Sequence, residues 1–206
     1  ENQLKALQQK NAALEENISG LSLVESRLKQ AALPTPRKSA DKRSEEVGGI
    51  PVDSDYVVFI IDTSGSMLTI WGRVLRTIGE VLDIHPTVRG FQILNDNGVY
   101  LLEAYRRRWI PDTPRRRKKV LEALGTWRST SNSSPVEGLE VALKTYAKPG
   151  TKTSIYIFGD DYTGSSFDTV IKKVELLNRN RTTRKPIVKI HGVGFISRHA
   201  TNRFPI

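Results

Sequence analysis

Three side chains that carry oxygen stand at every second position directly after an apolar run. Residues 56–61 read YVVFII, and Asp62, Ser64 and Ser66 follow them, with Gly65 between the two serines. Alternate positions of an extended loop project to the same side, so the carboxylate and both hydroxyls can face one point. Glycine lets the backbone turn tightly between the serines. Hard oxygen donors in this arrangement favour Mg²⁺ or Mn²⁺ over a soft metal.

Two further segments could complete this shell of oxygen donors. The polar loop 129–134 reads STSNSS and precedes Pro135, while Asp160 and Asp161 follow another apolar run at 154–158. In an open α/β sheet, ligands bind beyond the carboxyl ends of the strands, where such segments meet. Mg²⁺ takes six oxygens and keeps some waters, so a site with few protein charges leaves an exchangeable position. An acidic side chain of a partner could fill it.

The apolar pattern predicts the elements that would position these donors. Asn95-Asp96-Asn97-Gly98 is a strong hairpin turn, so residues 99–104 are expected to return as an antiparallel edge strand. Buried strands that alternate with helices are typical of an α/β fold with a doubly wound, mainly parallel sheet and helices on both faces. The predicted strands are 56–61, 90–94, 99–104, 154–158 and 187–193, and the predicted helices are 68–82, 114–124, 135–147 and 165–178.

From residue 52 to about residue 196 the sequence resembles the von Willebrand factor A (VWA) domains. Residues 62–66, DTSGS, match the DxSxS motif at the core of the family's metal-ion-dependent adhesion site (MIDAS). Residues 133–139, SSPVEGL, are similar to its T-x-P-x-x-A-L segment, and IYIFGDD and IHGVGF resemble two of its later strands. DxSxS alone is a weak signal, whereas four segments in the right order are a strong one. The resemblance implies a VWA/Rossmann-like fold and a binding module that is not an enzyme.

The resemblance also implies which residues hold the ion. Ser64 and Ser66 would bind it through their hydroxyls, and the two aspartates would act at close range or through bound waters. Ser133 stands where the family usually has threonine, and GDD at 159–161 replaces the usual TDG. The implied metal site consists of Asp62, Ser64, Ser66, Ser133 and Asp160. Further oxygen donors that could join it, or take the place of Ser133, are Thr130, Ser131, Ser134 and Asp161.

Other interpretations of these residues remain open. Asp62 could cap the following helix, because aspartate is a preferred N-cap residue. It could also be a phosphoryl-transfer nucleophile, but phosphatases of the haloacid-dehalogenase type need a second acid where Ser64 stands. Neither Ser64 nor Ser66 lies in a G-x-S-x-G elbow, and the absence of cysteine excludes thiolate chemistry. We therefore expect a non-enzymatic domain.

The charge of the chain suggests an alternative function. Of the formal net charge of +10, residues 56–206 hold +11, with 24 of the 32 Lys and Arg and 13 of the 22 Asp and Glu. Such a domain attracts acidic partners or nucleic acid. A basic segment surrounds Trp109 and could bind phosphates, but no nucleic-acid-binding motif accompanies it, so we favour a protein partner. The basic segment comprises Arg106, Arg107, Arg108, Arg115, Arg116, Arg117, Lys118 and Lys119.

The first residues have a heptad pattern. With Leu4 at position a, every d position from Leu7 to Leu28 is leucine, and Asn11 falls at a. This pattern favours a parallel dimeric coiled coil over residues 1–33, although a single amphipathic helix lying on the domain is the alternative. Residues 34–51, rich in proline, glycine and mixed charges, are expected to be a flexible linker. Residues 52–206 would form the VWA domain, which we expect to be truncated at its C-terminal end.

Coil, linker and domain together resemble bacterial envelope proteins in which a membrane anchor precedes the coil. The sequence opens at Glu1 within a periodic pattern, so we expect a preceding segment that anchors the protein. On this resemblance the domain would be periplasmic and would engage a protein of a membrane complex, while a cytoplasmic location is the alternative.

Overall fold

A computed structural model describes residues 46–47, 50–51, 53–86, 88–127, 129–164 and 166–197. The predicted coiled coil at 1–33 and most of the predicted linker lie outside the described residues. Near the end of that linker, strands β1 (Glu46–Val47) and β2 (Ile50–Pro51) pair antiparallel. None of the helices within the described ranges is long and apolar enough to cross a membrane.

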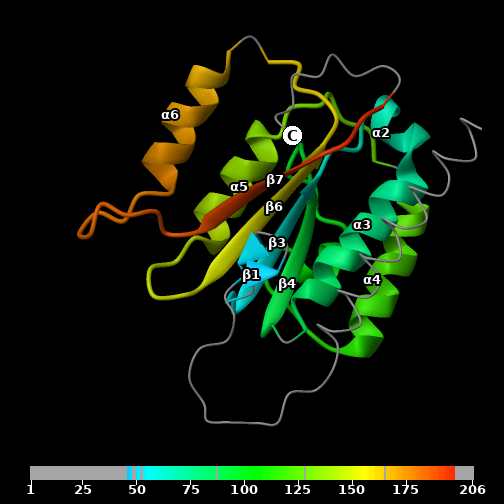
Figure 1. The fold of residues 1–206 in the computed structure, drawn as a ribbon, viewed down its shortest axis with the longest axis horizontal. Helices are drawn as coiled ribbons and strands as arrows, with labels where there is room; N and C mark the ends of the chain where they lie inside the picture. Colours follow the sequence, from blue (N-terminus) through cyan, green and yellow to red (C-terminus); the bar gives the residue numbers. More distant parts are fainter. Residues whose placement is uncertain are drawn as a thin grey trace, which may run out of the picture. The chain divides into compact units, whose positions relative to one another are not determined.

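The main sheet has five strands in the order β5-β4-β3-β6-β7 (Figure 1). The four longer strands are parallel, and the short β5 pairs antiparallel with β4 at one edge. This arrangement confirms the predicted mainly parallel sheet with one antiparallel edge strand. The strands are β3 (Tyr56–Ile61), β4 (Gly90–Asn95), β5 (Ile110–Pro111), β6 (Thr153–Gly159) and β7 (Lys189–Gly194).

Helices cover both faces of the sheet, with α3 and α4 on one face and α5 and α6 on the other (Figure 1). The predicted helix 68–82 is divided into α2 and α3, which Ile70 separates. The helices are α2 (Gly65–Thr69), α3 (Trp71–Ile84), the single 3₁₀ turn η1 (Glu103–Tyr105), α4 (Pro114–Thr126), α5 (Val136–Tyr146) and α6 (Phe167–Leu177).

Strand β3 is apolar throughout because it lies in the middle of the sheet and is covered on both sides. Alternate side chains of a strand point to opposite faces. Val57 and Phe59 therefore pack into the core beneath α3 and α4, while Val58 and Ile60 pack into the core beneath α5. All four are fully buried. This central position holds the residues that follow β3 in a defined place.

The predicted return strand at 99–104 is wrong. After the hairpin turn the chain makes only an isolated bridge between Leu94 and Tyr100 and then enters η1. The side chain of Gln92 donates to the carbonyls of Tyr105 (2.9 Å) and Arg108 (2.6 Å), which draws this segment into a turn beside β4.

Strand β5 takes the edge position instead. Trp109 stacks on Tyr56 and packs against Tyr146, each with ring centroids 4.5 Å apart, and this anchors the chain just before β5. A Cβ added to Gly90 would lie 3.0 Å from both Trp109 Cβ and the carbonyl oxygen of Ile110. Glycine at position 90 thus permits the close approach of β5 to β4, and Pro111 suits an edge strand because it has no N–H to donate.

Candidate metal site

Three neighbouring parallel strands each lead into an aspartate. Asp62 follows β3, Asp96 follows β4, and Asp160 follows β6. Ile61 pairs with Asn95 on one side and with Phe158 on the other. Because adjacent strands lie about 4.8 Å apart, this register brings the three aspartates to one edge of the sheet.

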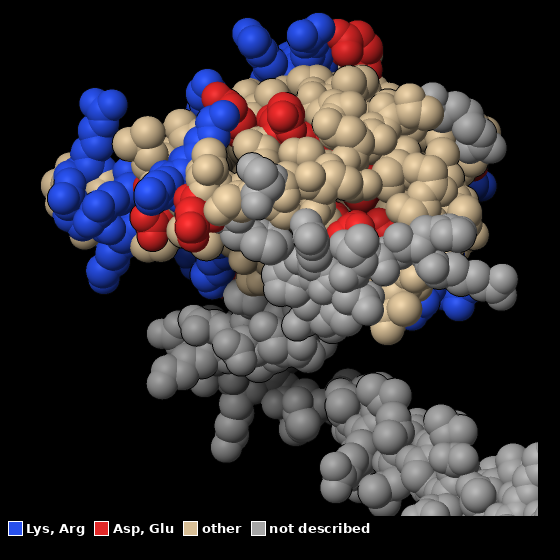
Figure 2. Space-filling view, turned by 90° about the horizontal axis from the view of Figure 1, so that it is seen from above, with Lys and Arg blue, Asp and Glu red and all other residues tan. Residues whose placement is uncertain are grey.

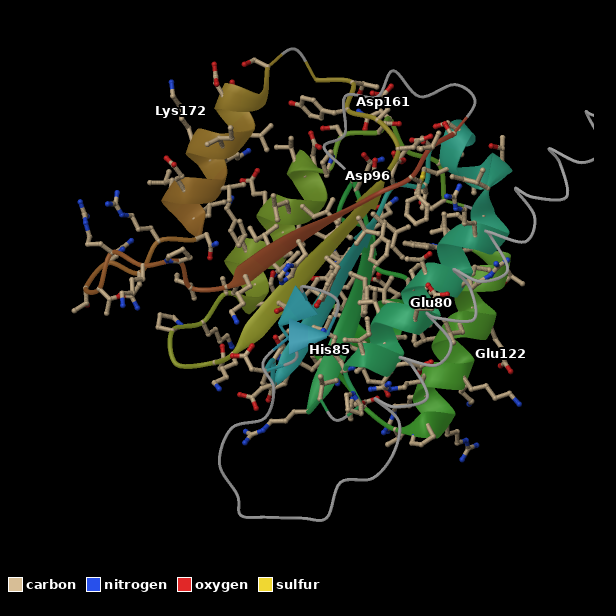
Figure 3. All side chains as sticks on the ribbon, viewed as in Figure 1. Glu80, His85, Asp96, Glu122, Asp161 and Lys172 are labelled. Atoms are coloured by element: carbon tan, nitrogen blue, oxygen red, sulfur yellow. The ribbon has the colours of Figure 1, made fainter. Side chains whose placement is uncertain are left out.

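Backbone hydrogen bonds extend the pairing past the strand ends. The N–H of Asp62 donates to the carbonyl of Phe158 (2.8 Å), and the N–H of Asp96 donates to the carbonyl of Ile61 (3.1 Å). Figure 3 shows Asp96 at this carboxyl-terminal end of the sheet, close in the view to Asp161. The main chains of Asp62 and Asp96 are therefore held side by side.

The two serines of the DxSxS segment join Asp62 to Asp160. Asp62 Oδ1 accepts a hydrogen bond from the N–H of Ser64 (2.7 Å), which fixes the turn after β3. The hydroxyl oxygens of Ser64 and Ser66 lie 3.0 Å apart, and the Ser66 hydroxyl donates to Asp160 Oδ1 (3.2 Å). Four of the five residues of the implied metal site are thus connected by consecutive contacts.

In the loop 129–134, the hydroxyl that contacts Asp62 belongs to Ser131. It donates to Asp62 Oδ1 (3.4 Å) and accepts from the N–H of Thr63 (3.1 Å). Ser133, which the resemblance places in the site, is buried and has a positive φ of 57°. Its carbonyl accepts a hydrogen bond from the N–H of Thr163 (3.2 Å), which holds this loop against the segment that follows Asp160.

The remaining oxygen donors named from the sequence are placed differently. Thr130 is exposed. The hydroxyl of Ser134 donates to Glu137 (3.1 Å), while its N–H donates to Asp96 Oδ2 (3.3 Å). Asp161 Oδ1 accepts from the N–H of Tyr162 (2.8 Å). Within this set, Ser131 is the hydroxyl with a direct contact to an aspartate of the site.

The three aspartates are almost fully buried, with 4%, 1% and 1% of Asp62, Asp96 and Asp160 exposed. One oxygen of each (Oδ2 of Asp62, Oδ1 of Asp96 and Oδ2 of Asp160) accepts no hydrogen bond from any residue that the structure describes. Burying a carboxylate without a partner costs free energy, so each of these oxygens calls for a proton or a cation.

The cost of burial shifts the pKa values of Asp62 and Asp96. Burial raises the pKa of Asp62 to about 6, the N–H of Ser64 opposes the shift, and the charges of Asp96 and Asp160 add to it. Burial also raises the pKa of Asp96, against the opposing effect of hydrogen-bond donors from Ser131, Thr63 and Ser134. Carboxylates that repel one another in a buried place are stabilised by a bound cation.

The donor set fits Mg²⁺ or Mn²⁺, since it consists of carboxylate and hydroxyl oxygens. No group of three or more Asp, Glu or His side chains among the described residues converges closely enough to hold an ion by itself. In the arrangement implied by the motif, the hydroxyls of Ser64 and Ser66 would serve as ligands, with the carboxylates acting partly through water.

Sequence reasoning overlooked Asp96, because the residues 95–98 were interpreted only as a hairpin turn. The signal that could have found it is the repetition of a buried apolar run that ends close to an aspartate. This holds for β3 with Asp62, for β4 with Asp96 and for β6 with Asp160. Parallel neighbours that share this feature bring their aspartates together.

The predicted basic segment does not form one uniform surface. Arg117, whose side chain is 16% exposed, pairs with Asp112 (2.7 Å) and donates to the carbonyls of Leu82 and His85 (2.6 Å each). Arg106 pairs with Glu103 (3.0 Å). By contrast, Arg115, Arg116 and Lys119 line a cavity of about 460 Å³. These three form no ion pair with a described residue.

A second basic area lies outside the predicted segment. Figure 2 shows Lys and Arg gathered at the end of the domain formed by α6 and the loop that follows it. The exposed basic residues of this area are Lys172, Arg179, Arg181, Arg184 and Lys185. The positive charge of the domain is therefore spread over at least two separate regions.

Comparison with known protein families and with curated proteins yields no match. Among solved structures, the chain is similar to a von Willebrand factor type A protein from Catenulispora acidiphila, with a TM-score of 0.51 and 14% sequence identity. The match covers 68% of this chain and 33% of that one, so the chain spans about a third of the length of this structural neighbour. The order of the elements along the chain, the topology of the sheet and the similarity to this solved structure together show that the chain has the fold of a von Willebrand factor A domain.

Proposed function

We propose that this domain is a metal-ion-dependent protein-binding module that engages an acidic residue of a partner protein. The fold is one whose family commonly mediates protein–protein interaction. The observation that carries the proposal is the gathering of Asp62, Ser64, Ser66 and Asp160, with a buried, unpartnered carboxylate oxygen on each aspartate. A bound cation would stabilise these oxygens, which accept no hydrogen bond from a described residue.

Each residue has a defined part in this mechanism. The hydroxyls of Ser64 and Ser66 would hold Mg²⁺ or Mn²⁺, which supplies an exchangeable coordination position for a partner's Asp or Glu carboxylate. The N–H of Ser64 and the hydroxyl of Ser131 orient Asp62 through Oδ1 and leave Oδ2 free to face the ion or its waters. Asp160 receives the Ser66 hydroxyl and thereby orients that ligand.

The rest of the proposal comes from the sequence. The net charge of +11 over residues 56–206 would speed encounter with an acidic partner and make association sensitive to salt. The predicted coiled coil at 1–33 would present two domains on one stalk. Placement in the bacterial envelope belongs to the same proposal and rests on the resemblance to anchored proteins.

The test is a pull-down in which this protein captures partners from a lysate of the source organism, with and without a chelator. The proteins that are lost when the chelator is present are then identified. We expect those partners to be lost as well with Asp62→Ala and with the double variant Ser64→Ala/Ser66→Ala. Thr126→Ala removes an exposed hydroxyl at the end of α4 and is the matched control. Retention of the same partners by the double variant in the presence of chelator would refute metal-dependent binding.

A nucleic-acid-associated factor is the second candidate. The cavity lined by Arg115, Arg116 and Lys119 favours it, because these cations are available to phosphates and Tyr105 lies beside them. Charge reversal at Arg115 and Arg116 would abolish binding under this candidate, whereas Asp62→Ala would leave it unchanged. Under the leading proposal the same reversal slows association only. Arg117 is excluded from this test because its side chain holds the fold together.

A further inference from the structure

Asp96 brings a negative charge to the site that the matched motif does not include. It lies directly after β4, beside Asp62, and is 1% exposed. Its Oδ1 is buried and accepts no hydrogen bond from a described residue. Oδ1 is thus a buried polar atom without a hydrogen-bond partner among the described residues. It lies at the edge of the sheet where the ion would bind.

The fold holds Asp96 in this place from the α5 side. The N–H of Ser134 donates to Asp96 Oδ2 (3.3 Å), and the N–H of Gly138 donates to the Asp96 carbonyl (2.6 Å). Gly138 allows this contact, since an added Cβ would lie 2.9 Å from that carbonyl oxygen. The first turn of a helix of eleven residues, α5, therefore faces Asp96, and its N-terminal dipole favours an ionised carboxylate.

The charge of Asp96 should affect the binding of both the ion and a partner's carboxylate. Two carboxylates, Asp62 and Asp160, neutralise a divalent ion, and such a neutral site accepts a further carboxylate from a partner at little electrostatic cost. A third carboxylate makes the loaded site negative, which strengthens retention of the ion and opposes the arrival of another anion. Asp96 Oδ2 is already held by the N–H of Ser134, and Asp96 acts on the ion through its charge.

We infer that Asp96 is the third negative charge of the cation site and that it sets the balance between tight binding of the ion and weak binding of a partner's carboxylate. The inference rests on the proposed function, because it assigns a role within the same metal site. It makes two predictions of opposite sign for one substitution, Asp96→Asn, which keeps the shape of the side chain and an oxygen that accepts from Ser134.

The first measurement is binding of Mn²⁺ alone, followed by the loss of the free-ion electron paramagnetic resonance signal. A unit charge a few ångströms from a divalent ion changes the affinity for that ion about tenfold even at the dielectric constant of water. Asp96→Asn is therefore expected to bind Mn²⁺ at least about tenfold more weakly. Glu122→Gln, which removes one exposed charge on α4 away from the site (Figure 3), is the control and is expected to match the unsubstituted protein.

The second measurement is binding of acetate to the Mn²⁺-saturated protein, followed by paramagnetic broadening of the acetate methyl resonance. Acetate stands for the carboxylate of a partner. Asp96→Asn is expected to bind acetate several-fold more tightly than the unsubstituted protein. If Asp96 had only a structural role, Asp96→Asn would weaken the binding of both Mn²⁺ and acetate. The two affinities would then not change in opposite directions.

The outcomes separate the inference from the proposed function. If Asp96→Asn binds Mn²⁺ as tightly as the unsubstituted protein, or if its acetate affinity does not rise, the inference is overturned and the metal site stands. If the unsubstituted protein binds no Mn²⁺, the proposed function fails and the inference fails with it. Should Asp96→Asn not unfold cooperatively, Asp96→Ser, which also retains an acceptor for Ser134, is measured in its place with the same expectations.

Discussion

The hydroxyl of Ser66 donates a hydrogen bond of 3.2 Å to Asp160 Oδ1, across 94 residues of sequence. The contact joins the first turn of α2 to the residue that follows β6, and Asp62 lies between β3 and α2. Residues that are remote along the chain thereby form one group of oxygen donors. The stability of the protein should depend on the charge of this group.

Asp62→Asn should stabilise the protein in the presence of chelator. The pKa of Asp62 is about 6 in the folded protein and 3.8 as its ordinary value, so the ionised form lowers the free energy of unfolding at neutral pH. We expect an increase of about 1–2 kcal/mol at pH 7 that disappears as the pH falls below about 4. Denaturant unfolding at both pH values measures it. A decrease at pH 7 would show that the ionised carboxylate stabilises the fold.

The same variant should lose the stabilisation that Mn²⁺ gives. A ligand at 100 times its Kd raises the free energy of unfolding by about 2.7 kcal/mol, because it binds only the folded state. Thermal unfolding with Mn²⁺ and with chelator is expected to differ for the unsubstituted protein and to coincide for Asp62→Asn. If Mn²⁺ raised the Tm of both proteins equally, the ion would bind at a site that does not involve Asp62.

A buried histidine should make the fold sensitive to acid. His85 Nε2 lies 2.7 Å from the Tyr156 hydroxyl, and burial, with the charges of His191 and Arg117, lowers the pKa of His85 to about 4. Since the unfolded chain takes up this proton near pH 6.5, the free energy of unfolding falls as the pH drops from 6.5 to about 4.

We expect this loss to reach about 2 kcal/mol and to be smaller in His85→Gln. The difference between the two proteins, measured by denaturant unfolding across pH 4–7, removes the opposite contribution of Asp62. Parallel pH profiles of the two proteins would contradict the prediction. Tyr156 lies in the same contact but does not titrate in this range, because burial raises the pKa of its hydroxyl.

Gly138→Ala should destabilise the contact between α5 and the end of β4. The added Cβ would lie 2.6 Å from the carbonyl oxygen of Asn95 and 2.9 Å from that of Asp96, and neither backbone atom can move freely. We expect a loss of about 2–4 kcal/mol in unfolding experiments. Gly79→Ala in α3 meets nothing within 4 Å and should instead stabilise by up to about 1 kcal/mol. Equal effects of the two substitutions would disprove the close approach.

Arg117→Ala should destabilise the protein more than any change to the exposed arginines beside it. Its loss would leave the Asp112 carboxylate, whose side chain is 7% exposed, without its partner, and would free the carbonyls of Leu82 and His85 at the end of α3. We expect a cost of about 3 kcal/mol, against less than about 0.5 kcal/mol for the exposed Arg115→Ala. Similar unfolding midpoints for Arg117→Ala and Arg115→Ala would show that the contacts of Arg117 add no more to stability than those of an exposed arginine.

Much of the architecture could be predicted from local patterns. The run at 56–61 predicted β3 because a short apolar run of β-branched and aromatic residues is typical of a strand covered on both faces. Pro114 and Pro135 predicted the beginnings of α4 and α5 because proline fits the first turn of a helix. The DxSxS spacing identified Asp62, Ser64 and Ser66 as neighbours, although the extended loop expected there ends at Ser64 and Ser66 lies in the first turn of α2. These features depend on neighbours in the sequence, so the sequence by itself determined them.

Tertiary structure decided which distant residues meet. Asp96 joins Asp62 because β4 and β3 are parallel neighbours in a particular register, and Ser131 contacts Asp62 because of the path of its loop. Likewise β5 occupies the edge at Ile110 because Trp109 packs against Tyr56, and not because of the turn at 95–98. Pairing and side-chain contacts between remote segments depend on the packing of the whole domain, which no local pattern of residues contains.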